Sequence, residues 1–355
     1  MAKNTLKFWT MRRDREIRVL LLLCAVVLVC IGLYFSHDIF APVSFAIFTI
    51  AIAWPLQRAL QAKIPKLLAL VVTIAVTLFV IVALAFTVVW GLSHVVEWLV
   101  NNNDRFQALY VQATEWLDEH GISITSLVAD SYNPSWMIGA AREIGGRGYR
   151  LISFIVIAFA FIVLGLLEVD VTRRNIERLK NPELRRSLLS ASEDIADKFQ
   201  KYMVVRTIMS IVTGLIFWSF ALAAGIELAT AWGIIAFVFN YIPFIGPLIA
   251  TLFPTLFALV QTGSWELSLA VFACLNFIQF FTGSYLEPRM AGATLSISPF
   301  VVLFAVFFWS FLWGISGAFI GAPIVIAILA ICDRHESTHW IALLLSGHDK
   351  EADPK

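Results

Sequence analysis

The sequence has few charged residues and few cysteines for its length. Only 14% of its 355 residues are Asp, Glu, Lys or Arg, whereas an ordinary soluble domain has about 25%. The formal net charge is +1, which gives no basis for expecting nucleic acid as a partner. The four cysteines match neither a metal motif nor a disulfide framework. A soluble domain, a nucleic-acid-binding protein and a disulfide-rich secreted scaffold are therefore disfavoured.

Hydrophobic residues are abundant instead, at 59%, and they gather in long blocks. A bilayer span needs about 20 mostly apolar residues, so the blocks predict an all-α, polytopic integral membrane protein. The basic start of the chain resembles a signal peptide but lacks a small-residue cleavage site, so we expect an uncleaved first helix. The predicted full spans are six: residues 17–35, 39–56, 67–90, 148–167, 203–225 and 266–283.

Lys and Arg near the ends of the spans predict the orientation. The start of the chain, the loop after the second span and residues 168–201 are rich in basic residues, whereas residues 91–147 are acid-rich. Both termini are therefore expected in the cytoplasm, with the amphipathic residues 91–147 outside. A structural or scaffolding role of this outside segment is an alternative to transport as the function of the protein. The expected division is a basic N-terminus (1–16), three membrane helices (17–90), a periplasmic segment (91–147), a fourth span (148–167), a charged cytoplasmic segment (168–202), a transport core (203–331) and a cytoplasmic tail (332–355).

Two apolar segments, residues 230–260 and 299–331, are too long for one span each, and both are interrupted. The first contains "NYIPFIGP" and the second "WGISGAFIGAP". Proline and glycine break helices, and broken backbone at membrane depth survives only where protein buries it or where it lines a cavity. Each segment is predicted to be either a re-entrant hairpin or one kinked span, and we favour hairpins. In transporters, such pairs indicate the substrate pathway, although small residues also serve tight helix packing.

Three stretches carry a family resemblance: "WGIIAFVFNYIPFIGPLIATLFP", "YLEPRMAGATLSISPFVVLFAVFFWSFLWGISGAFIGAPI" and "KYMVVRTIMSIVTGLIFW". They resemble the autoinducer-2 exporter family of bacterial inner-membrane proteins. The resemblance implies a multi-span permease that self-associates, with a pentamer expected. It implies export of a small polar molecule, with autoinducer-2 as the candidate. Sodium or lithium/proton antiport is the alternative, and no cofactor or metal is expected.

Polar residues near the first break are the first candidates for the pathway. Asn240 and Tyr241 fall on the family motif, where an amide and a phenol beside broken backbone can bind a polyhydroxylated substrate or a cation. Asn276 and Gln279, three residues apart, are expected on one face of a membrane helix. Hydrogen bonding between helices, purely for packing, is the alternative role for this pair.

The second family motif places Glu287 and Arg289 on either side of Pro288. We expect these two residues to form an ion pair that gates a hairpin, or Glu287 alone to bind a proton or cation; a solvated loop is the alternative. The expected substrate pathway comprises Asn240, Tyr241, Pro243, Gly246, Pro247, Asn276, Gln279, Glu287, Pro288, Arg289, Gly317, Gly321 and Pro323.

One motif suggests an enzyme instead. His335, Glu336 and His339 form a literal H-E-x-x-H, which on a helix can bind zinc in an intramembrane metalloprotease. The motif follows the last span, however, and no clear third ligand comes after it. We therefore interpret it as a polar cluster at a membrane exit and do not expect an enzyme.

Overall fold

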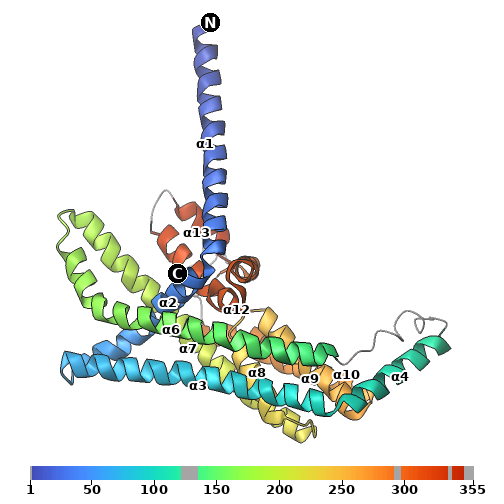
Figure 1. Ribbon diagram of the computed structural model, residues 1–355. Coiled ribbons are helices and arrows are strands. Elements are labelled where there is room, and N and C mark those ends of the chain that lie inside the picture. The colour runs from blue at the N-terminus through green and yellow to red at the C-terminus, as the bar shows by residue number, and fades with distance from the viewer. Residues whose placement is uncertain (1, 121–134, 292–296, 335–337, 348–355) are drawn as a thin grey trace.

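The computed structural model describes residues 2–120, 135–291, 297–334 and 338–347 (Figure 1). Every named element in these ranges is a helix, and one isolated antiparallel bridge joins Ile297 to Ser346. The elements are α1 (Ala2–Phe35), α2 (His37–Gln61), α3 (Lys66–Asn101), α4 (Asn103–Glu119), α6 (Ser135–Glu177), α7 (Pro182–Ala223), α8 (Ala229–Phe239), α9 (Ile245–Thr262), α10 (Trp265–Phe280), the π-helix η1 (Phe281–Leu286), α11 (Glu287–Ala291), α12 (Pro299–Cys332) and α13 (His339–Leu345).

Eight of the described helices are long and apolar enough to cross a bilayer. Six of them contain the predicted full spans, namely α1, α2, α3, α6, α7 and the continuous run from α10 to α11. The other two, α9 and α12, belong to the interrupted segments. The prediction of an all-α, polytopic membrane protein is therefore confirmed.

Helices continue beyond the predicted membrane boundaries. α3 runs on to Asn101, and α6 extends to Glu177, past the predicted end of its span. α7 begins at Pro182, where the Asn181 side chain accepts hydrogen bonds from the backbone N–H groups of Glu183 and Leu184. Such an N-cap fixes where a helix starts. α1 projects away from the other helices (Figure 1), and near its end the Trp313 indole donates to the carbonyl of Leu33.

Polar contacts define two ends of the helical assembly. At the first, which we call the α13 face, Lys66 lies 3.8 Å from Asp170, Arg173 pairs with Glu193, and Arg334 pairs with Asp194. These contacts join the start of α3, the end of α6, the N-terminal third of α7 and the residues just after α12.

At the opposite end, which we call the α4 face, the Trp98 indole donates to the Glu227 carboxylate over 2.5 Å. Arg105, in α4, donates to the carbonyl of Gln261. The end of α3 and the start of α4 therefore lie beside both ends of the α8–α9 segment.

The main hydrophobic core lies where α3, α7, α8, α9 and α10 meet. Trp98 and Trp232 both pack on Phe257, with ring centroids 4.2 and 5.1 Å apart. α7 and α8 cross at Gly214 and Gly233, where a Cβ on Gly214 would lie 2.9 Å from the Gly233 carbonyl oxygen. Two small residues thus let the backbones touch, as is usual between membrane helices.

Candidate functional site

The first interrupted segment folds as a helical hairpin made of α8 and α9. Its two ends are tied together, since the Glu227 N–H donates to the Gln261 side chain, which donates to the Gly225 carbonyl. Near the tip, a Cβ on Gly246 would lie 1.8 Å from the carbonyl oxygen of Phe239. The arms therefore touch at the tip and meet again at the α4 face, as a re-entrant hairpin requires.

The tip between the arms, residues 240–244, satisfies much of its own backbone. The N–H groups of Asn240, Tyr241 and Ile242 donate to carbonyls of the last turn of α8, and Gly246 donates to Ile242. Phe244 adopts a φ of +64°, which is uncommon for a residue with a side chain. Since these N–H groups are already bonded, hydrogen-bond donors for a substrate at the tip come mainly from its side chains.

The second interrupted segment, α12, is also a hairpin. Gly314 has φ +62° and ψ −142°, a backbone conformation essentially restricted to glycine, and the two arms fold back at this point. A Cβ on Gly317 would lie 1.8 Å from the Trp309 carbonyl oxygen, and one on Gly321 would lie 3.1 Å from that of Ala305. These contacts pair residues in antiparallel order, with the turn between them.

The two ends of α12 lie together at the α13 face. The Ser298 N–H donates to the carbonyl of Leu345 in α13, and the Thr338 hydroxyl donates to the carbonyl of Cys332. Both interrupted segments therefore have the hairpin geometry that we favoured, and they enter the assembly from opposite faces. Pro323 is buried in the second arm of α12.

The two hairpins meet inside the protein. Ile242, at the tip of the first, packs in one buried cluster with Val306 and Ala318, which come from the two arms of the second. The ring of Tyr241 lies 6.4 Å from that of Phe319. Opposed hairpins in contact at membrane depth are typical of transporter binding sites.

A line of polar contacts runs along α7 beside the first hairpin, and we call it the polar seam. The Asn240 amide donates to the Ser210 hydroxyl over 3.3 Å, and the Tyr241 phenol donates to Thr207 over 3.0 Å. Nearer the α13 face, the Arg206 guanidinium donates to Glu287 over 2.8 Å. The seam comprises Arg206, Thr207, Ser210, Asn240, Tyr241 and Glu287.

Several buried polar atoms have no hydrogen-bond partner among the described residues. Two of them lie on α7 at or next to the seam, namely Nε of Arg206 and the Thr213 hydroxyl, and both amide atoms of Gln279 on α10 are also unpaired. Arg206, Ser210 and Thr213 follow a spacing of four and three residues, so they share one face of α7. Buried polar groups without partners are costly and call for an explanation; at a transport site, they are groups that a substrate could bind.

The structure corrects two predictions about the pathway residues. Asn276 is exposed and its amide donates to the carbonyl of Phe272 in the same helix, whereas Gln279 is buried, so the expected shared face is wrong. Arg289 does not pair with Glu287; it is exposed and lies over the Tyr285 ring at 4.2 Å.

The remaining pathway candidates differ in their surroundings. Pro288 is exposed, Pro247 is half-buried, and Pro243 is buried beside the tip. Gly317 and Gly321 are buried and provide the close contact of the arms of α12 rather than polar groups.

Our sequence analysis missed Arg206, Thr207 and Ser210. An arginine inside the apolar block 203–225 was the available signal, because ionisable residues in membrane helices usually face the protein interior and are functional. Its partner, 81 residues further along the chain, could not be read from spacing.

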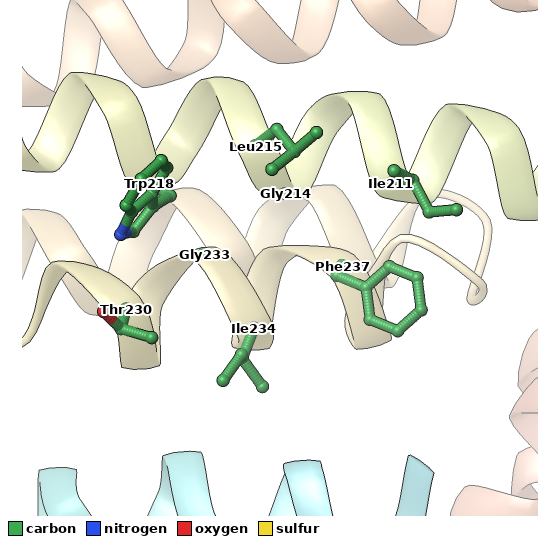
Figure 2. A pocket seen from close by; sticks show the side chains of 8 residues that line it. All are labelled: Ile211, Gly214, Leu215, Trp218, Thr230, Gly233, Ile234 and Phe237. Atoms are coloured by element: carbon green, nitrogen blue, oxygen red, sulfur yellow. The ribbon is translucent and has the colours of Figure 1, made fainter. Parts of the chain in front are cut away.

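A groove of about 330 Å³ lies on another face of α7 and α8. Figure 2 shows its lining, which is apolar apart from the polar atoms of Trp218 and Thr230; the other residues are Ile211, Gly214, Leu215, Gly233, Ile234 and Phe237. This chemistry does not suit a polar substrate, so the groove is not the candidate site.

The H-E-x-x-H motif falls largely outside the described residues, since 335–337 are not among them. Of its histidines, His339 is described, and its Nδ1 lies 3.2 Å from both the carbonyl and the carboxylate of Asp333. Among the described residues, no group of three or more His, Cys, Asp or Glu is placed to hold a metal ion.

Comparisons with known proteins show which family the sequence matches. The model of a family described as AI-2E family transporter matches residues 23–336. The chain is 26% identical over 337 residues to the AI-2 transport protein TqsA of Escherichia coli K12, covering 94% of this chain and 97% of that one. It is 29% identical over 198 residues to a putative transport protein of Borreliella burgdorferi, covering 56% and 55% of the two chains. A putative transport protein of Haemophilus influenzae is 22% identical, with 92% and 96% covered.

Proposed function

Because this chain belongs to the AI-2E transporter family, we propose that it exports a small polar molecule across the bacterial inner membrane, with autoinducer-2 as the first candidate. The relative named as an AI-2 transport protein supports this choice of candidate. We propose no enzymatic activity.

The observation that carries the proposal is the contact between the opposed hairpins beside the polar seam. At this point the protein offers the Asn240 amide, the Tyr241 phenol and the hydroxyls of Thr207 and Ser210. Such groups both donate and accept hydrogen bonds. They match a small hydroxylated molecule without a large net charge.

Antiport of sodium or lithium against protons has weaker support. A proton relay across a membrane usually needs titratable groups at depth. Among the residues whose burial is described, no Asp or Glu side chain is classed as buried. Arg206 neutralises the half-buried Glu287 directly.

We also propose that both termini are cytoplasmic and that the protein is a homo-oligomer, for which the resemblance suggests a pentamer. The orientation is supported by the basic residues at the α13 face, including Lys63, Lys66, Arg173 and Arg334. Mass measurement of the protein in lipid nanodiscs tests the assembly, and a monomer there would contradict it.

Flux from proteoliposomes tests the function. Vesicles loaded with autoinducer-2 and containing the purified protein should release it faster than protein-free vesicles. Asn240→Ala removes a buried hydrogen bond at the hairpin tip, and we expect its rate to fall about tenfold, the kinetic equivalent of about 1.4 kcal/mol. Asn276→Ala is the matched control, because this amide is exposed and bonds only within its own helix in the described contacts.

The outcomes separate the parts of the proposal. Release at the protein-free rate by the wild-type protein would remove autoinducer-2 as the substrate. Equal flux through the Asn240 and Asn276 variants would remove the hairpin tip from the pathway.

A further inference from the structure

A largely buried ion pair joins α7 to α11, through Arg206 and Glu287. Arg206 and Glu287 lie 2.8 Å apart, with side chains 9% and 24% exposed, and the guanidinium also lies 5.7 Å from the Tyr202 ring. Taking two charges out of water is costly, and such a pair often adds little net stability compared with apolar residues. Charged residues within membrane helices are correspondingly uncommon and usually functional. The pair therefore needs a role other than simple packing.

The position of the pair relates it to the proposed pathway. Arg206 precedes Ser210 by one helical turn, about 6 Å along α7, on the side of the α13 face. Ser210 contacts the tip of the first hairpin through Asn240. The ion pair is consequently the part of the polar seam nearest the α13 face, and the contact of Ser210 with the hairpin tip lies beyond it.

The carboxylate of this pair sits directly after an unusual helical turn. Residues Phe281–Leu286 form the π-helix η1, and Glu287 begins α11 immediately after it. A π-helix holds one extra residue in a turn, and such turns are frequent at functional sites. Changing η1 to an α-helical turn would rotate α11 by about 100° relative to α10, because each α-helical residue accounts for that angle. This rotation would carry Glu287 away from Arg206.

Two features favour movement of Glu287 rather than of Arg206. The Glu287 side chain is the more exposed of the two, so it can reach water, whereas Arg206 keeps its contact with Tyr202. Within η1, Gly283 is exposed and a Cβ there would meet nothing within 4 Å, so the turn has room to rearrange.

We propose that the Arg206–Glu287 ion pair is the gate that closes the polar seam toward the α13 face, and that η1 is the hinge that opens it. This inference rests on the proposed transport function, because a gate presupposes a pathway. It assigns Arg206 a positioning role: the residue holds the gate shut and need not touch the substrate.

Thiol labelling from each face of the membrane tests the gate without any substrate. In a background lacking Cys24, Cys30, Cys274 and Cys332, Ser210→Cys places one thiol just beyond the pair. We expect slow reaction with an impermeant maleimide applied from the α13 face. Glu287→Gln should accelerate labelling from that face about tenfold or more, and leave the rate from the α4 face unchanged.

The matched control is Glu193→Gln, which breaks an exposed Arg–Glu pair of the same type, joined over 3.2 Å at the α13 face. It should label as slowly as the parent. The charge-swapped variant Arg206→Glu/Glu287→Arg should restore slow labelling. Loss of fold alone would admit the reagent from both faces and would appear as a changed elution volume.

The hinge has its own test. Deleting Gly283 removes the extra residue of η1, so a regular α-helical turn keeps Glu287 directed at Arg206 and leaves no hinge to rotate it away. We expect the thiol introduced by Ser210→Cys to label from the α13 face about tenfold more slowly than in the parent. Gly283→Ala keeps the chain length and should label at the parent rate.

Labelling of Glu287→Gln at the parent rate, or equal acceleration by the charge-swapped variant, would overturn the gate. Labelling at the parent rate or faster after deletion of Gly283 would overturn the hinge. A protein that labels as expected but moves no autoinducer-2 would instead contradict only the proposed substrate.

Discussion

Replacing Gly317 with alanine tests the packing of the second hairpin. The new Cβ would lie 1.8 Å from the carbonyl oxygen and 2.4 Å from the carbonyl carbon of Trp309. Real Cβ atoms essentially never approach another heavy atom within 3.0 Å, so the arms of α12 must separate by about 1.2 Å. The neighbour is backbone, which cannot turn aside as a side chain can.

Overpacking of this kind costs about 1–3 kcal/mol, and a backbone clash belongs at the upper end of that range. For a chain of 355 residues, about 3 kcal/mol corresponds to a fall of roughly 4 °C in the unfolding midpoint. Thermal unfolding in detergent, followed by fluorescence-detected size exclusion, measures this midpoint. The matched control is Gly283→Ala, where the added Cβ meets nothing within 4 Å. Equal midpoints for the two variants would refute the close contact of the arms.

Three further substitutions follow from the same structure. Gly314→Ala forces a side chain onto φ +62°, ψ −142° and should lower the free energy of unfolding by about 1–3 kcal/mol. The loss should exceed that of Gly263→Ala, at φ +67°, ψ 6°. Equal midpoints of the two variants in thermal unfolding would contradict the turn geometry. Asn181→Ala removes the N-cap of α7 and should lower the free energy of unfolding by about 1 kcal/mol. Proteolysis between α6 and α7 should be faster in this variant, and an unchanged rate of digestion would be evidence against the cap. Trp98→Phe keeps an aromatic ring but loses the bond from the indole to Glu227, which should lower the free energy of unfolding by about 1.5–3 kcal/mol. An unchanged midpoint would show that this bond does not hold the first hairpin to α3.

The sequence was sufficient to predict the membrane helices and the positions of the two breaks. Long apolar blocks have few ways to satisfy backbone groups in lipid, so they predict helices almost regardless of packing. Prolines and glycines marked the breaks, and both segments do fold back, at residues 240–244 and at Gly314. Helix ends were less predictable, because α3 and α6 continue as helices outside the apolar blocks.

The candidate site was only partly predictable, because it depends on contacts between distant segments. Asn240 and Tyr241 were found from their motif, but their partners on α7 were not. The expected pairing of Glu287 with Arg289 relied on proximity in sequence, whereas the structure brings Arg206 to Glu287 through the packing of α11 on α7. Similarly, a spacing of three residues did not place Asn276 inside with Gln279, because the buried face of α10 is narrow.

The sidedness of the loops next to the hairpins distinguishes two opposed hairpins from two full membrane spans. Single cysteines at Gly263 and Met290, in a cysteine-free background, can be probed with an impermeant thiol reagent in intact cells. Opposed hairpins place Gly263 at the α4 face and Met290 at the α13 face, so the account predicts labelling at Gly263 and none at Met290. Labelling at Met290 but not at Gly263 would mean that both interrupted segments cross the membrane, and would contradict the account.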